Sequence, residues 1–506
     1  MLHLSGKFIL VILFIVFTSL SSQGRVHMVS DYGATGDKLT NDAPALQRAI
    51  EACAKDGGGM VYVPAGDYFC GQLLLKSNIT LFLESGATLW VSPRQEHYPQ
   101  ENTFLYARDA ENISIAGRGR IRGTGSDDLR RKKEDERPKP KFRVGILQLL
   151  RCRDVSIKDI TIRSSDAWTL DLEFCENVVI DGVNILNNYY RVNADGIDPV
   201  SCKNVRISNC HIIAGDDCIV CKSRQNMPCQ DVVITNCTLS SIATAVKIGT
   251  ESHSDFCNIH VSNCVIRDSA VGIGIYIKDG ATAERLSFSN LTIETMREPD
   301  LVREYVKNSI YPIFVDIEKR RAESRVGRIQ DLNFTDIFII SNNGNLIQGM
   351  TNQNIENVVL RNITMRVDKP FDFGRRRKHV GGRAEDTDDR RRTTFAQKPS
   401  YMTLANIRGL TVDGLQVFVP EEIYEKYPYA ALSLHNVQRG HISNISRLPA
   451  GPGMPVVILE NCRDSLISNC MALPQTDVFL KITGEQTKNI SLQGNDFSRA
   501  RKAVEQ

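Results

Sequence analysis

Apolar and polar residues alternate in short segments that recur along the chain about every 20 to 30 residues. In "KNVRISNC", "QDVVITNC" and "CNIHVSNC", apolar residues return at every second position, which is the pattern of a half-buried β-strand. The segments place Asn209, Asn236 and Asn263 27 residues apart, and "ERLSFSNL" continues the series at Asn290. No helical pattern separates the strands, which argues against alternating βαβ units. The spacing therefore predicts a β-solenoid whose stacked coils share one core.

The residues that close each segment support this prediction. Asparagine tolerates the left-handed backbone of a tight turn, and stacked Asn side chains can hydrogen-bond from coil to coil. Cys210, Cys237 and Cys264 stand where an inward apolar residue belongs. We expect them to be buried thiols rather than disulfide partners.

The segment "TNDAPALQRAIEACAKDGGG" has a helical pattern instead. Leu46, Ala49, Ile50 and Cys53 recur at the i, i+3, i+4, i+7 spacing of one helix face. Asn41 is expected to cap the helix N-terminus, and the three glycines that follow the pattern end the helix. A helix here would cover the unpaired strand edges at the N-terminal end of the solenoid.

The N-terminus has the three-part form of a secretory signal peptide, with Lys7 before an apolar run at 8–17 and small polar residues after it. We assign residues 1–24 to this peptide and expect the protein to be secreted or periplasmic. The apolar run is short for a transmembrane helix. Residues 25–506 are expected to form one β-helix domain, with charged loop insertions at about 126–143 and 368–399 that lack periodicity.

Composition excludes several classes of function. The 506 residues are 42% hydrophobic and 24% charged, so the chain can bury a core. With 62 basic and 59 acidic residues the net charge is +3, which gives no general drive toward nucleic acid or a membrane surface. The Cys-x-x-Cys pair at Cys218 and Cys221 has no second pair at zinc-site spacing, so we expect packing or a local disulfide with Cys229. No motif predicts a metal or a cofactor.

Two aspartate clusters flank one predicted strand. "NADGID" holds Asp195 and Asp198, and "GDDC" holds Asp216 and Asp217. Isolated clusters of this kind are most simply turn residues. Asp195 and Asp216, however, are 21 residues apart, close to one coil, and stacked strands lie about 5 Å apart. The clusters are therefore expected to share one surface patch, provided that Gly215 allows a turn that exposes both adjacent aspartates. Crowded carboxylates raise one another's pKa, as a general acid requires.

On these motifs the chain resembles glycoside hydrolase family 28, the polygalacturonases and related pectin hydrolases. "DYGATGDKLTNDAPALQRAIEACAKDGGG" and "RPKPKFRVGILQLLRCRDVSIKDITIRSSDAWTLDL" carry the likeness, which covers most of residues 26–300. "NADGID" is similar to the family's Asn-Thr-Asp motif, with Ala194 in place of Thr, and "GDDC" to its paired aspartates. The resemblance implies an all-β fold, a single-stranded right-handed parallel β-helix with an N-terminal capping helix. It also implies inverting hydrolysis of α-1,4-linked galacturonate.

The resemblance also implies roles for single residues. Asp216 corresponds to the general acid on the glycosidic oxygen, and Asp195 and Asp217 to the pair that holds and deprotonates the attacking water. Asn193 and Asp198 correspond to supporting residues of the site. Inverting enzymes commonly hold their carboxyl groups about 6.5–9.5 Å apart to leave room for that water. We therefore expect Asp195 and Asp216 to be offset from each other.

Two elements of the family are missing. Its Gly-His-Gly motif corresponds to "SSIATAVKIGTE", with Ala243 where the histidine is expected. Its Arg-Ile-Lys motif corresponds to "GIYIKDG", which keeps Lys278 but has Tyr276 in place of arginine. Tyrosine lacks the guanidinium fork that binds a carboxylate, and offers a stacking face and one hydroxyl. A branched or mixed pectic polymer such as rhamnogalacturonan is therefore favoured over unsubstituted polygalacturonate.

Trp168 and Glu251 complete the set of candidates. Trp168 is interpreted either as a sugar platform or as packing beneath the cleft, and Glu251 as a carboxylate that takes over part of the missing histidine's function. We predict an exported monomeric hydrolase of a pectic, acidic polysaccharide. Two alternatives stay open. One is a polysaccharide lyase on the same fold, which would need Ca²⁺ or a strong base, and the other is a glycan-binding homologue with weakened catalysis.

Overall fold

The computed structural model describes residues 25–129, 142–296, 310–350, 353–368, 400–424, 429–446 and 453–506. The predicted signal peptide and most of both charged segments lie outside these residues. Within the described ranges, no helix has the length and apolar character needed to cross a bilayer.

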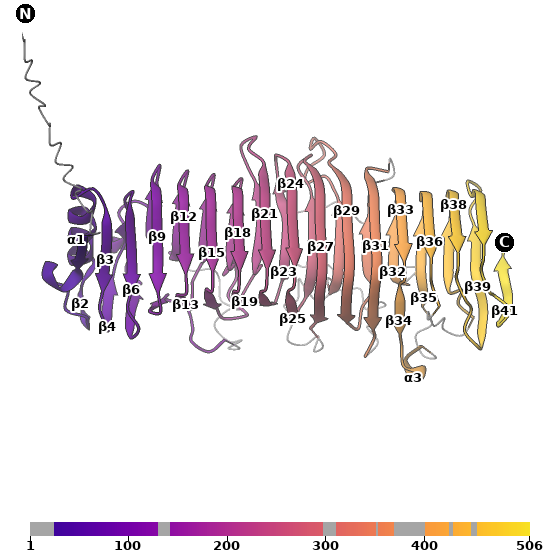
Figure 1. The fold of residues 1–506 in the computed structure, drawn as a ribbon, viewed down its shortest axis with the longest axis horizontal. Coiled ribbons are helices and arrows are strands. Elements are labelled where there is room, and N and C mark those ends of the chain that lie inside the picture. Colours follow the sequence, from indigo (N-terminus) through magenta and orange to yellow (C-terminus); the bar gives the residue numbers. More distant parts are fainter. Residues whose placement is uncertain are drawn as a thin grey trace, which may run out of the picture.

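The chain winds into a long parallel β-helix, whose coils follow one another from the N-terminus to the C-terminus (Figure 1). The fold class predicted from the repeat is confirmed. Strands of successive coils align in register, as in the series Val178, Val205, Val232 and Ile259. Because adjacent named strands run parallel, equivalent side chains of neighbouring coils become neighbours in space.

Two sheets share the described strands. Sheet B has fifteen strands: β5 (Leu73–Leu74), β8 (Thr103–Arg108), β11 (Gly145–Leu150), β14 (Leu170–Glu173), β17 (Ile197–Val200), β20 (Ile219–Ser223), β23 (Thr244–Ser252), β26 (Val271–Ile277), β28 (Tyr311–Ile317), β30 (Asn345–Gln348), β32 (Ser400–Ala405), β35 (Ala430–His435), β37 (Val457–Glu460), β39 (Thr476–Thr483) and β41 (Ala500–Glu505).

Sheet A has twenty-six described strands: β1 (Arg25–Met28), β2 (Asp37–Asn41), β3 (Gly59–Val63), β4 (Gly66–Cys70), β6 (Ile79–Leu83), β7 (Ala87–Val91), β9 (Glu111–Gly117), β10 (Arg120–Arg122), β12 (Arg153–Lys158), β13 (Thr161–Arg163), β15 (Glu176–Asp181), β16 (Asn184–Leu186), β18 (Lys203–Ser208), β19 (His211–Ala214), β21 (Cys229–Thr235), β22 (Thr238–Ser241), β24 (Phe256–Ser262), β25 (Val265–Ser269), β27 (Thr282–Thr295), β29 (Arg328–Ile340), β31 (Ile355–Arg366), β33 (Ile407–Asp413), β34 (Gln416–Phe418), β36 (Gln438–Ser443), β38 (Arg463–Ser468) and β40 (Lys488–Gln493). The described helices are α1 (Ala43–Lys55), α3 (Glu421–Tyr424), η1 (Val29–Tyr32) and η2 (Gln95–His97).

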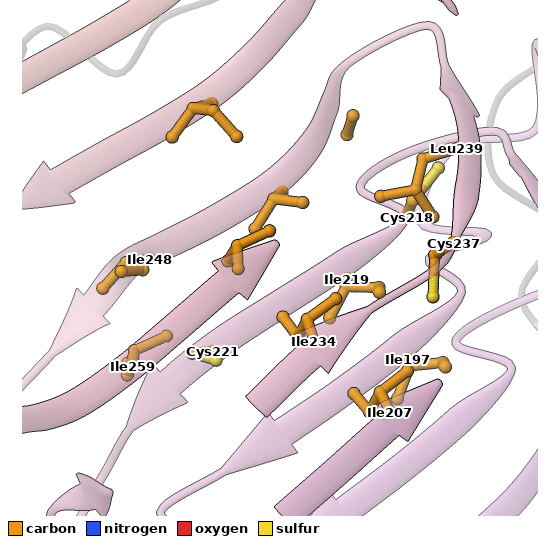
Figure 2. Packing of buried hydrophobic residues seen from close by; sticks show 14 of the residues in the cluster. Ile197, Ile207, Cys218, Ile219, Cys221, Ile234, Cys237, Leu239, Ile248 and Ile259 are labelled. Atoms are coloured by element: carbon orange, nitrogen blue, oxygen red, sulfur yellow. The ribbon is translucent and has the colours of Figure 1, made fainter. Parts of the chain in front are cut away.

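Alternate residues of the strands fill the interior. Ile197 and Ile219 of sheet B lie in the same buried cluster as Ile207 and Ile234 of sheet A (Figure 2). Burying one such side chain stabilises the fold by about 1.5–3 kcal/mol relative to leaving it exposed. Because the inward positions are apolar, the polar and charged side chains of sheet B that could form a functional site lie on its outward positions.

The turn asparagines form part of the predicted ladder, because Asn263 Nδ2 donates to Thr235 Oγ1 at 3.3 Å rather than to Asn236. Asn209, Asn236, Asn263 and Asn290 all have a left-handed backbone, with φ between 51° and 56°. Asn290 Nδ2 donates to Asn263 Oδ1 at 2.7 Å, and Asn236 Nδ2 to Asn209 Oδ1 at 3.5 Å. The ladder stabilises the turns between stacked coils.

The cysteines serve as core residues. Cys210, Cys237 and Cys264 are buried and free, which confirms the prediction for them. Cys218, Cys221 and Cys229 are buried free thiols too, so packing and not a local disulfide explains their spacing.

Helix α1 covers the N-terminal end of the solenoid, as predicted (Figure 1). Its cap differs by one residue from the prediction, because the N-cap position belongs to Asp42 and not to Asn41. The Asp42 carboxylate accepts the backbone N–H groups of Thr35 and Gly36. Asn41 instead ends β2, and its Oδ1 accepts the N–H of Ala43 at 3.2 Å. The preceding loop thus decides which residue caps the helix.

Candidate active site

The two aspartate clusters lie in turns that precede neighbouring strands of sheet B. Asp195 comes before β17, and Asp216 and Asp217 come before β20. The turns are hydrogen-bonded to each other, since the N–H of Gly196 donates to the Asp217 carbonyl at 2.9 Å and that of Gly215 to the Ala194 carbonyl at 3.1 Å. A Cβ atom on Gly215 would lie 2.3 Å from the Arg191 carbonyl oxygen, so only glycine fits this turn.

The three candidate catalytic aspartates converge. One carboxylate oxygen from each of Asp195, Asp216 and Asp217 lies within 4.8 Å of the others. Asp195 and Asp217 are 3% and 2% exposed, whereas Asp216 is half-buried. The nearest oxygens are closer than the offset that inverting enzymes commonly show. This spacing therefore does not support the offset expected between Asp195 and Asp216.

Lys222 is the buried partner of the first cluster. It extends from β20, and its ammonium pairs with Asp198 and lies 3.6 Å from Asp195 Oδ2. Burial opposes a charge here, but Asp198 and Asp195 outweigh it and raise the pKa of Lys222. The same ammonium lies 3.5 Å from the centre of the Trp168 ring, a cation–π contact. Lys222 thus joins Asp195, Asp198 and Trp168.

Lys247 is the partner of the second cluster. Its Nζ lies 2.7 Å from Asp217 Oδ2, while the N–H of Thr244 donates to Asp217 Oδ1 at 3.3 Å. Both contacts come from β23, one coil further along the chain. Asp216 is contacted from the preceding coil, where the N–H of Asn193 donates to Asp216 Oδ2 at 3.0 Å. Three close carboxylates can also suit a metal ion, but lysine ammonium groups supply positive charge here, and we assign no metal.

Burial sets the proton affinity of the first cluster. Burial and the neighbouring charge of Asp198 raise the pKa of Asp195 well above its usual range. Burial also raises the pKa of Asp198 to about 6, despite the opposing effect of Lys222. One oxygen of each has no hydrogen-bond partner among the described residues. These carboxyl groups therefore bind protons at a higher pH than an exposed aspartate does.

Asp171 is a further buried carboxyl group beside the site. It lies in β14, in register with Asp198 of β17, and its Oδ2 accepts Gln148 Nε2 at 2.9 Å. Burial, followed by repulsion from Asp198, raises the pKa of Asp171 to about 8. The sequence analysis did not select this residue.

Replacing Asp171 with asparagine is expected to raise stability at neutral pH. Because the pKa of Asp171 is raised in the folded state, the folded chain keeps a proton that the unfolded chain releases near pH 4. The free energy of unfolding therefore falls as the pH rises from about 4 through 8. Asparagine carries no such cost, and we expect a gain on the order of 1–3 kcal/mol. Thermal unfolding from pH 4 to 9 measures it, with Asp231→Asn in strand β21 of sheet A as control. Parallel pH curves for wild type and Asp171→Asn would contradict this expectation.

Trp168 and Glu251 lie together on one side of the cluster. Arg224 contacts Glu173 at 2.9 Å and Glu251 at 3.1 Å, and its guanidinium lies 5.5 Å from the Trp168 ring. Although burial opposes it, Arg224 lowers the pKa of Glu251, so this side chain is a charged ion-pair partner. That state does not suit the proton-handling role suggested for Glu251.

Tyr276 and Lys278 lie on the coil of β26, the strand that pairs with β23. The Tyr276 ring packs 5.0 Å from that of Phe314 and lies 5.6 Å from the Lys247 ammonium. Lys278 Nζ pairs with Glu318 at 3.2 Å. Tyr276 therefore borders the aspartate cluster through Lys247, while Lys278 is held by an acidic partner.

The sequence analysis did not select four residues of the site, namely Lys222, Lys247, Asp171 and Arg224. A usable signal existed for the lysines, because each is the single charged residue of an otherwise apolar or small-residue segment, "IVCKS" and "TAVKIG". A lysine on such a strand needs an acidic partner, and the aspartate clusters are the nearest source.

Known proteins resemble this chain over part of its length. The model of the glycosyl hydrolases family 28 matches residues 53–370, more than half of the chain. A "Probable polygalacturonase" of Vitis vinifera is 29% identical over 232 residues, 41% of this chain and 46% of that protein. A "Probable rhamnogalacturonase A" of Aspergillus oryzae is 27% identical over 213 residues, 41% of this chain and 42% of that protein. The match thus spans less than half the length of these curated relatives.

Solved structures agree on the architecture. The family 28 exopolygalacturonase of Yersinia enterocolitica aligns with a TM-score of 0.56 at 17% identity, over 82% of this chain and 78% of that one. At this identity the likeness concerns the fold alone, a parallel β-helix.

Proposed function

Because the chain belongs to glycoside hydrolase family 28, we propose that it hydrolyses glycosidic bonds of a pectic polysaccharide. The observation that carries this proposal is the convergence of carboxylate oxygens of Asp195, Asp216 and Asp217 within 4.8 Å of one another, in the turns before β17 and β20 of sheet B. When crowded carboxyl groups differ in burial, their pKa values differ, so that one group can donate a proton while another accepts one.

In the proposed mechanism Asp216, the most exposed of the three, protonates the glycosidic oxygen. The bond from that oxygen to the anomeric carbon breaks as a water molecule attacks the same carbon. Asp217 takes the proton of the water, with Asp195 beside it, so one water is added across the bond. Proton exchange with solvent then restores both groups. General acid–base catalysis of this kind contributes about 10²–10⁴-fold to the rate.

The proposed substrate is a branched or mixed pectic polymer. Tyr276 stands in place of the family's arginine and packs on Phe314, which favours a stacked sugar ring over a bound carboxylate. The matched relatives carry names of both kinds, polygalacturonase and rhamnogalacturonase. We further propose that the protein is exported, on the signal-peptide pattern of its N-terminal sequence, and that it acts as a monomer.

An end-product assay tests the function. Purified protein is offered polygalacturonate, rhamnogalacturonan and neutral glycans, and reducing ends and ultraviolet absorbance are followed together. New reducing ends without absorbance support a hydrolase. Absorbance from unsaturated ends would indicate the alternative lyase. Binding without either product would indicate a glycan-binding protein, and would overturn the proposal.

Restoring the arginine at position 276 is expected to shift specificity toward uronate polymers. Tyr276→Arg supplies the planar fork that binds a carboxylate, and we expect the KM for polygalacturonate to fall about 10-fold. Tyr276→Phe is the matched control, because it keeps the ring on Phe314 and removes only the hydroxyl. Kinetics on polygalacturonate and rhamnogalacturonan measure the change. An unaltered preference in Tyr276→Arg would show that this side chain does not select the substrate.

A further inference from the structure

Asp216 and Asp217 are neighbours in the chain but are held by different coils. The Asn193 N–H, on the coil before, contacts Asp216, whereas the Lys247 ammonium and the Thr244 N–H, on the coil after, contact Asp217. Both oxygens of Asp217 therefore accept hydrogen bonds from β23, one of them from a positive charge. Charge-assisted bonds of this kind favour the ionised carboxylate.

Lys247 itself stays charged. Burial opposes its charge, but Asp217 and Asp216 outweigh burial and raise the pKa of Lys247 above its usual range. Its ammonium is therefore a fixed positive charge beside Asp217 throughout the pH range in which carboxyl groups titrate.

The other charges around Asp217 do not replace this contact. The charged groups are Asp195 and Asp198 on the coil before, Asp216 on the same turn, and Lys222 in β20. The Cys218 thiol and the Tyr276 hydroxyl of β26 also interact with Asp217, and burial raises the pKa of both. The Lys222 ammonium contacts Asp198 and lies 3.6 Å from Asp195. The two lysines thus serve different carboxylates.

We propose that Lys247 is the positioning residue whose ammonium holds and stabilises the Asp217 carboxylate, so that Asp217 accepts the proton of the attacking water. The inference rests on the proposed hydrolase function. Lys247 would supply positive charge on the coil where the family's histidine is absent, since Ala243 lies four residues before it. A lone pair of the water oxygen forms the new bond to the anomeric carbon, the electrons of the broken O–H bond stay on that oxygen, and the released proton moves to Asp217.

Lys247→Met tests the proposal, with Lys247→Arg as the conservative variant and Lys203→Met, an exposed lysine of sheet A, as control. An opposite charge within 4–6 Å shifts carboxyl titration by about 1–3 pH units. We therefore expect the acidic limb of kcat/KM in Lys247→Met to move to higher pH by about that amount. We expect kcat at acidic pH to fall at least 10-fold, and Lys247→Arg to keep the wild-type profile. A raised KM with an unmoved acidic limb would overturn the proposal and make Lys247 a substrate-binding residue.

A second measurement does not depend on turnover. The carboxyl carbon of Asp217 is followed by NMR in ¹³C-Asp-labelled protein, and Asp217→Asn assigns the signal. The titration midpoint of that signal is expected to rise by about 1–3 pH units in Lys247→Met. Equal midpoints in Lys247→Met and wild type would overturn the proposal even in an inactive protein. Lack of turnover by the wild type, in contrast, would count against the proposed function alone.

Discussion

Asp216→Asn is expected to abolish the release of reducing ends while the β-helix stays folded. Asp216 is half-buried and accepts the Asn193 N–H at 3.0 Å, a bond that the amide oxygen of asparagine can still accept. Asparagine cannot donate the proton that the leaving oxygen needs, so we expect a loss of about 10²–10⁴-fold in kcat. Initial rates on the polymer that the wild type cleaves measure it, beside the melting temperature.

The control for this variant is Asp231→Asn, which changes an aspartate in strand β21 of sheet A. Asp231 accepts the side chain of Asn258 at 2.7 Å and has no place in the cluster. It should keep full activity. A wild-type rate in Asp216→Asn would remove Asp216 as the acid and leave one of the other two aspartates in that role.

Lys222→Met is expected to destabilise the fold strongly at neutral pH. The variant leaves Asp198, which is 0% exposed, without its ammonium partner, and it removes the positive charge nearest to Asp195. Removing one partner of a buried pair costs about 3–5 kcal/mol. The loss should shrink as the pH falls, because protonation of Asp198 removes the unpaired charge. In the variant this protonation occurs above the wild-type pKa of about 6, since Lys222 no longer lowers the pKa of Asp198.

Thermal unfolding at pH 5 and pH 8 measures this effect, with two companion variants. Lys222→Met/Asp198→Asn removes both charges and should recover most of the lost stability. Lys203→Met breaks an exposed pair with Glu176 and should cost less than about 1 kcal/mol. An equal loss in Lys222→Met and Lys203→Met, or no recovery in the double variant, would show that the buried pair has no special weight.

The sequence by itself determined the fold and the position of the aspartates. Strict alternation in "KNVRIS" allows only a strand with one buried face, and a turn asparagine every 27 residues allows the strands to stack in register. Gly215 marked the turn that holds Asp216 and Asp217, and the close approach of the Arg191 carbonyl shows why no other residue serves there. The turn leaves only Asp216 partly exposed, because Asp217 is 2% exposed, so the expectation that both would be exposed was wrong. These features are local, so periodicity and turn chemistry suffice to predict them.

Only the tertiary structure decided which charges meet. Lys247 lies 30 positions after Asp217 and Lys222 lies 24 positions after Asp198, and the coils between them differ in length. A shift of one residue in either coil would turn the lysine to the other face of its strand. Asp171 is selected in the same way, by its register with Asp198. The proton affinities of the site follow from burial and from these long-range neighbours, and alternation along the chain encodes neither of them.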